Sequence, residues 1–221
     1  MEKKIINALT RCPLFNNISE QHLIDIVEGA KYKLVKFDKK DIYILAGMPY
    51  RHVDLIVEGE MVARVVSLSG KSVEVSRLVG GDLVAPAFIF AKDNLMPVSV
   101  ETEKETTVLR ISKPDFVELI DINPVLRRNF ITILSNIDVF LTKKMRVLSL
   151  FTVREKVGYF LKEAAGKQGS NVVQLNKSRQ EIAESFGIQK FSLLRTMSEL
   201  QEAGAIRVEG KRITILDRNK L

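Results

Sequence analysis

The chain of 221 residues is 46% hydrophobic and 28% charged, so it has enough apolar surface to bury a core, its length suits two domains, and wholesale disorder is excluded. Its formal net charge of +7 favours an acidic partner such as a nucleic acid, and the excess is greatest in residues 149–221, where 13 Lys and Arg stand against 8 Asp and Glu. The most prominent uncharged apolar stretch, residues 83–91, is far shorter than the roughly 20 residues that cross a bilayer, so no membrane partner is expected.

The amino-terminal segment and the potential metal ligands exclude further classes. Residues 1–15 lack an extended apolar region followed by a small-residue cleavage site, so a cytoplasmic protein is expected. Cys12 is the only cysteine and His22 and His52 are the only histidines, so neither an intramolecular disulfide nor the usual zinc spacings can be assembled. A cupin-like metalloenzyme, the enzyme alternative, needs clustered His and carboxylate ligands, and we therefore predict neither a metal site nor catalytic residues.

The first half of the chain predicts a short helix followed by a sheet. Ser19 can cap a helix that Gly29 ends. In residues 32–111, short β-branched runs are separated by Gly, Pro and Asp, which is typical of a sandwich or small barrel. We predict an antiparallel β-roll of the jelly-roll type. Ser112 followed by Pro114 then predicts another short helix.

Asn123-Pro124 begins a long helix that carries an apolar stripe. The stripe runs for about three heptads without Gly or Pro, which suits a helix that pairs with an identical helix in a homodimer. Packing of the stripe against the chain's own β-roll is the alternative. The predicted dimer interface consists of Leu126, Phe130, Ile133, Ile137, Leu141, Met145 and Leu148.

Two pairs of residues with the spacing of a capping box predict helix starts in the last third of the chain. Thr152 with Glu155 and Ser178 with Glu181 can satisfy free amide groups at a helix start reciprocally. The helix after Ser178 ends at Gly187, and a second helix follows within a few residues. Two helices joined by a turn that contains Gly predict a helix-turn-helix.

Residues 205–217 alternate apolar residues around Glu209-Gly210, which predicts a β-hairpin with a tight turn. This hairpin would be the wing of a winged helix. The predicted fold class is therefore α+β, with an amino-terminal β-roll, a long dimerisation helix and a carboxy-terminal winged helix-turn-helix.

The second helix of the helix-turn-helix can enter a DNA major groove about 12 Å wide. Its amino-terminal half is expected to contact base edges, and the nearby basic residues are expected to contact phosphates. A solvated basic face on a protein-binding module is the alternative. The predicted DNA-binding residues are Arg179, Gln189, Lys190, Phe191, Ser192, Arg195, Lys211 and Arg212.

The order of these features resembles the cyclic AMP receptor protein and fumarate–nitrate reductase regulator (Crp/Fnr) family. The resemblance is carried by Gly47, the VEG of residues 57–59, GGDLVAPAFIF, Asn123-Pro124 and SRQEIAESFGIQKFSLLRTMSELQEAGAI. It implies a homodimer, an effector pocket inside each cyclic-nucleotide-binding-like β-roll, and winged helices on a roughly palindromic promoter, with RNA polymerase as a further partner. The predicted domains are 1–122 for effector sensing, 123–150 for dimerisation and 151–221 for DNA binding.

Two departures from the family pattern bear on the effector. Cyclic-nucleotide-binding members have Gly-Glu for the ribose and Arg-Ser for the phosphate where this chain has Ala85-Pro86 and Met96-Pro97. Because Met and Pro cannot replace a bidentate Arg contact to a buried phosphate, cyclic AMP is not expected as the effector. An apolar pocket is predicted instead, although the same residues could simply fill the core. Its residues are Pro86, Phe88, Met96 and Pro97, joined by Leu141 and Thr142, which stand where family members let the long helix touch the ligand.

The sequence also limits which iron-containing cofactor the chain could hold and which operator it is expected to bind. One cysteine cannot hold an iron–sulfur cluster, whereas haem stays open as an effector, with His52, His22, Cys12 or a Met as ligand. In the DNA-reading helix, Lys190-Phe191 replaces the family's Arg-Glu, while Arg195 can still pair with guanine. The operator is therefore expected to differ from that of the cyclic AMP receptor.

Overall fold

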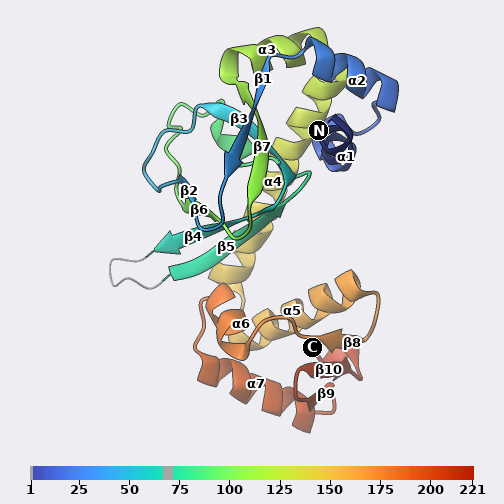
Figure 1. The fold of residues 1–221 in the computed structure, drawn as a ribbon. Coiled ribbons are helices and arrows are strands. Elements are labelled where there is room, and N and C mark those ends of the chain that lie inside the picture. The colour runs from blue at the N-terminus through green and yellow to red at the C-terminus, as the bar shows by residue number, and fades with distance from the viewer. Residues whose placement is uncertain (1, 67–71) are drawn as a thin grey trace. The chain divides into compact units, whose positions relative to one another are not determined.

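The computed structural model describes residues 2–66 and 72–221, whose helices and strands follow one another as Figure 1 shows. They form two compact units, Met1–Asp138 and Val139–Leu221. The predicted α+β class is confirmed, with an antiparallel sheet domain first and a helix-turn-helix last. Within the described residues, no helix is both long and apolar enough to cross a membrane.

The amino-terminal unit is a β-roll made of two antiparallel sheets. One sheet has the strand order β1-β7-β3 and the other has the order β2-β6-β4-β5. Apolar cross-strand pairs such as Val35 with Val108 and Leu55 with Leu109 set the register of the first sheet. The strands are β1 (Tyr32–Phe37), β2 (Ile42–Ile44), β3 (His52–Glu58), β4 (Glu60–Val66), β5 (Ser72–Val79), β6 (Ser99–Thr102) and β7 (Thr106–Ser112).

Helices pack against the strands of the roll. α1 (Glu2–Arg11), which the sequence did not predict, buries Ile5, Ala8 and Leu9 and contacts β3. α2 (Glu20–Gly29) begins where the Ser19 hydroxyl accepts the amide hydrogen of His22, so the predicted cap is present. The remaining helical elements are the 3₁₀ turns η1 (Pro13–Phe15) and η2 (Pro86–Phe88), and α3 (Lys113–Ile122) and α4 (Pro124–Leu150).

One face of the first turns of α4 is buried in the core of the β-roll. Phe130 is 4% exposed, and its ring centroid lies 5.2 Å from that of Phe116 and 5.6 Å from that of Phe90, both edge-on. Leu126 is fully buried in the same core. The prediction that Leu126 and Phe130 form a dimer interface is therefore wrong, because their side chains are already covered by the chain's own β-roll.

The carboxy-terminal unit contains the predicted winged helix-turn-helix. Its hairpin strands β9 and β10 are joined by β8, a third strand that the sequence did not predict, in the order β8-β10-β9. Both predicted capping boxes are formed, one at Thr152 and one at Ser178. The elements are α5 (Val153–Gln168), β8 (Val172–Gln174), α6 (Arg179–Ser185), α7 (Lys190–Glu202), β9 (Ile206–Glu209), β10 (Arg212–Ile215) and the 3₁₀ turn η3 (Arg218–Lys220).

The division between the compact units falls inside α4, between Asp138 and Val139. The second half of α4 belongs to the carboxy-terminal unit because Val147 is buried in that unit's core. The ranges 1–122, 123–150 and 151–221 stay a prediction of how the functions are distributed along the chain.

Candidate nucleic-acid interface and effector cavity

The helix-turn-helix is built from local hydrogen bonds around α6. The Ser178 hydroxyl accepts the amide hydrogen of Glu181 at 3.2 Å, and the Glu181 carboxylate accepts the amide hydrogen of Ser178 at 2.7 Å. Hydrogen bonds from the Ser178 hydroxyl and from the Ser178 amide stabilise the Glu181 carboxylate and lower the pKa of Glu181. At the other end of α6, Gly187 has φ +62°, a left-handed conformation that suits glycine, and α7 starts three residues later.

The two faces of α7 differ sharply. Leu193, Met197 and Leu200 are buried in the core of the unit. Phe191, in contrast, is 74% exposed on the first turn, which is costly for an aromatic ring unless a partner covers it. The structure brings five predicted DNA-binding residues together at this end of α7: Gln189, Lys190, Phe191 and Arg195 are exposed, and Ser192 is half-buried.

Arg195 is held along the helix surface. Its Nε donates to the Glu199 carboxylate at 3.0 Å, and both side chains are largely exposed. A single Nε contact leaves both Nη groups of the guanidinium outside this pair, and those are the groups that a guanine O6 and N7 can use.

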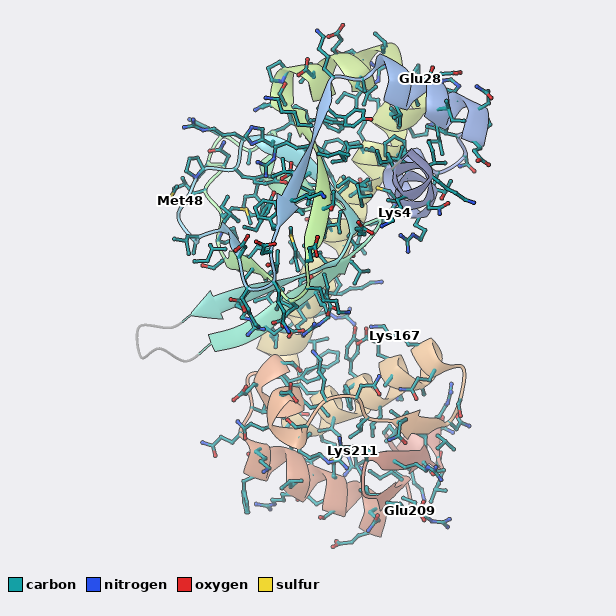
Figure 2. All side chains as sticks on the ribbon, in the orientation of Figure 1. Lys4, Glu28, Met48, Lys167, Glu209 and Lys211 are labelled. Atoms are coloured by element: carbon teal, nitrogen blue, oxygen red, sulfur yellow. The ribbon has the colours of Figure 1, made fainter. Side chains whose placement is uncertain are left out.

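The remaining predicted basic residues, at and beside the wing, differ in how exposed their side chains are. Lys211, labelled with Glu209 at the wing in Figure 2, and Arg212 are exposed. Arg179 is half-buried, because its Nη2 donates to the Gly210 carbonyl at 2.9 Å and braces the wing turn against the start of α6. Its buried Nη1 has no hydrogen-bond partner within the described residues, and burial lowers the pKa of Arg179.

A mostly apolar cavity of about 560 Å³ lies in the amino-terminal unit. The predicted residues Pro86, Phe88, Met96 and Pro97 all line it. Leu141 and Thr142 are exposed residues of the other compact unit and are not among its lining residues, so their assignment to the pocket stays a prediction. From α4 the lining takes Ile133 and Ile137, which the sequence placed in the dimer interface.

The charges at this cavity are already paired. Of the lining residues, Arg77 donates from Nη2 to Glu74 at 2.8 Å and also pairs with Glu60 through Nη1. Asp82 accepts the amide hydrogen of Val79 at 2.8 Å. A guanidinium shared by two carboxylates is a poor phosphate ligand, because an added phosphate would have to displace them.

A buried ion pair fixes one wall of the cavity. Asp54 is fully buried on β3 and accepts from Nε and Nη2 of Arg110 at 2.9 and 2.6 Å, which raises the pKa of Arg110. Tyr43 donates to the same carboxylate at 2.5 Å, and Tyr50 donates to the carbonyl of Val84 at 2.8 Å. Val84 lines the cavity, so this network stabilises the wall that leads into η2.

The haem ligands suggested by the sequence do not converge on the cavity. His22 and His52 are exposed and are not among the lining residues. Cys12 is buried in the core, and burial raises the pKa of its thiol to about 12, which disfavours the thiolate that binds iron. Among the residues that line the cavity, Met96 is the one whose side chain was suggested as a haem ligand, and a single thioether does not make a haem site. In the described part of the chain, no group of three or more His, Cys, Asp or Glu could hold a metal ion.

The exposed face of α4 carries a different stripe from the predicted one. Leu141 is 56% and Met145 63% exposed, and Leu148 is exposed as well. Ile131, which the prediction omitted, is also exposed. The sequence already contains the alternating steps of 3 and 4 residues that define a heptad repeat, and this spacing identifies the stripe. The heptad stripe consists of Ile131, Leu134, Asp138, Leu141, Met145 and Leu148, all of them exposed except Leu134, which is half-buried against the amino-terminal core.

Two family descriptions match separate parts of the chain. Residues 34–123 match the cyclic nucleotide-binding domain, and residues 155–221 match the Crp-like helix-turn-helix domain. The first match falls in the β-roll that contains the cavity, and the second in the unit with the exposed end of α7.

Whole proteins of similar sequence are transcription regulators by name. The transcriptional activator protein FnrA of Stutzerimonas stutzeri is 29% identical over 128 residues, which is 56% of this chain and 52% of that protein, so the match spans about half the length of FnrA. The cAMP-activated global transcriptional regulator CRP of Pasteurella multocida is 21% identical over 184 residues, 81% of this chain and 88% of that protein.

A solved structure shares the fold over nearly the whole chain. A mutant of CooA from Carboxydothermus hydrogenoformans superposes with a TM-score of 0.68 at 18% identity, covering 95% of this chain and 93% of that one. At this identity the likeness concerns the fold alone.

Proposed function

Because this chain belongs to the Crp/Fnr family of transcription regulators, we propose that it acts as a homodimer that binds a roughly palindromic promoter sequence through its two winged helices. The observation that carries the proposal is the exposed amino-terminal end of α7, where Phe191 and Arg195 stand on a helix whose other face is core. We propose no catalytic role. The site of action is the cytoplasm, where promoter DNA and RNA polymerase are the partners.

The chemistry of this surface supports base reading. The two Nη groups of Arg195 can donate to the O6 and N7 of guanine, and the Phe191 ring can contact a thymine methyl group. Lys211 and Arg212 are placed to contact phosphates beside the groove, which fix position without reading sequence.

Arg195→Ala is expected to weaken operator binding by roughly 1–3 kcal/mol and to relax the preference at one base position, because a bidentate base contact is lost. Lys211→Ala is expected to weaken binding to all sequences about equally and to lower the salt dependence by about one phosphate contact. Fluorescence titrations against a set of operator variants at two salt concentrations measure both effects. If both variants give the same profile across sequences, Arg195 does not read bases.

The dimer is proposed to form along the heptad stripe of α4. In two paired parallel helices, this stripe places Leu134, Leu141 and Leu148 in one set of layers, and Ile131 and Met145 in the alternate set. Two identical chains would present their α7 helices to half-sites about one helical turn, roughly 34–36 Å, apart.

The effector is proposed to be an uncharged, largely apolar small molecule. The cavity of about 560 Å³ falls within the size range of ligand pockets, and the guanidinium that lines it is already paired. A ligand there would touch Ile133 and Ile137 of α4, and through them it would bias the helix that carries the heptad stripe. We do not propose haem, because the donor set does not fit it.

Cyclic AMP is expected to give no saturable heat when it is titrated into the full chain in a calorimeter. Its phosphate would have to lie against Met96 and Pro97 in a cavity whose lining cation, Arg77, is already paired with two carboxylates and cannot replace the phosphate's hydration. Saturation at micromolar nucleotide would reject the apolar effector class.

A further inference from the structure

The second half of α4 is joined to the helix-turn-helix by one charged side chain. Lys144 on α4 reaches the carboxy-terminal end of α6, where its Nζ donates to the carbonyl of Ser185 at 3.1 Å. The same Nζ lies 5.0 Å from the ring centroid of Phe186, the residue that caps α6. Both residues belong to the same compact unit, and Val147, one turn further along α4, is buried in its core.

The position of Lys144 suits the charged form of the amine. The last carbonyls of a helix lack intrahelical partners and carry the negative end of the helix dipole, so a cation there is stabilised. The Phe186 ring adds a cation–π interaction. Burial lowers the pKa of Lys144, Glu163 on α5 opposes that shift, and Lys177 and Lys167 add to it.

We propose that Lys144 is a positioning residue that fixes the orientation of α6, and with it the DNA-reading helix α7, relative to α4. The inference rests on the proposed function, because it assigns to α4 the role of carrying the signal from the cavity and the heptad stripe. Ile133 and Ile137 line the cavity two to three turns before Lys144 on the same continuous helix. When the end of α4 rotates, the Lys144 ammonium group transmits this rotation to the end of α6, just before the turn at Gly187. The covalent connection at Leu150 to Thr152 is then not the only link between α4 and the helix-turn-helix.

A purely stabilising lysine provides the matched control. Lys220 donates from Nζ to the carbonyl of Ala203 at 3.1 Å, and Ala203 caps α7. It therefore makes the same kind of bond to a helix end in the same unit, but it comes from the carboxy-terminal segment and not from α4. Lys220→Met removes equivalent chemistry without touching the proposed link.

The experiment compares Lys144→Met, Lys144→Gln, Lys144→Arg and Lys220→Met in the full chain. Spin labels at Ser149 on α4 and Ser198 on α7, in a Cys12→Ala background, report the distance distribution without DNA. We expect a broader or shifted distribution for the Met and Gln variants of Lys144, and an unchanged one for Lys144→Arg and Lys220→Met. The neutral Gln variant keeps the test valid if Lys144→Met fails to fold.

The same variants are then titrated with palindromic DNA. Lys144→Met and Lys144→Gln should bind about tenfold more weakly, Lys144→Arg within about threefold of the parent, and all with an unchanged salt slope, because no phosphate contact is lost. A salt slope reduced by about one would mean that Lys144 contacts phosphate, and it would overturn the proposal, as would a distance distribution equal to that of Lys220→Met. If the parent chain binds no duplex DNA, the proposed function fails, while the spin-label distances still decide the role of Lys144.

Discussion

Phe130→Ala is expected to lower the free energy of unfolding of the amino-terminal unit by about 3–5 kcal/mol without dissociating the proposed dimer. The ring is almost wholly buried and is held edge-on by Phe116 and Phe90, so its removal leaves a cavity that these neighbours cannot fill. Urea unfolding followed by circular dichroism measures the loss, and analytical ultracentrifugation measures the oligomeric state.

Phe140 on the same helix is the control for this result. It is exposed and lies off the heptad stripe, so Phe140→Ala should change the free energy of unfolding by less than about 0.5 kcal/mol. A Phe130→Ala chain that dissociates into monomers without losing stability would restore Phe130 to the dimer interface and contradict the structure.

Leu141→Glu is expected to dissociate the proposed dimer, with a loss of dimer affinity of about 100-fold or more, and to abolish tight binding to a palindromic operator. The two-fold symmetry of a homodimer places the new carboxylate on both helices, where two like charges would be buried against each other. Asp138 already contributes one polar layer to the same stripe, three residues away, which leaves less apolar contact to compensate. Sedimentation and fluorescence anisotropy with duplex DNA measure the two losses.

Val139→Glu separates a position effect from a charge effect. Val139 is exposed but points away from the heptad stripe, so the same new charge there should leave both the dimer and DNA binding intact. Dimers of Leu141→Glu as stable as those of Val139→Glu would remove the heptad stripe as the interface.

Features set by a few neighbouring residues were predicted well. The capping boxes at Thr152 and Ser178 each need only two side chains three positions apart, and both form. The hairpin around Glu209-Gly210 depends on a turn and its flanking alternation, and it forms with Gly210 at φ +59°. The strand β8 escaped prediction because its three residues are too few for a periodic signal.

The residues of the candidate DNA-binding surface also differ in whether neighbouring sequence could place them. Gln189, Lys190, Phe191 and Arg195 could be placed on the outer side of α7, since the helical period alone separates them from Leu193 and Met197. Their contacts with DNA stay predictions. Arg179 could not be placed from sequence, because its partner at Gly210 lies in the wing, 31 residues further along the chain.

The sequence by itself determined most of the elements and their order, with α1 and β8 as exceptions, together with the winged helix-turn-helix and the apolar residues that line the cavity from η2 and its surroundings. The tertiary structure alone decided what covers each face of α4. Phe130 packs against Phe116 and Phe90, and Ile133 and Ile137 line the cavity. The physical reason is that one helical period fits several sets of apolar residues on α4 equally well. Side chains from distant parts of the chain decide which set is buried in the chain's own core and which set stays exposed to a partner.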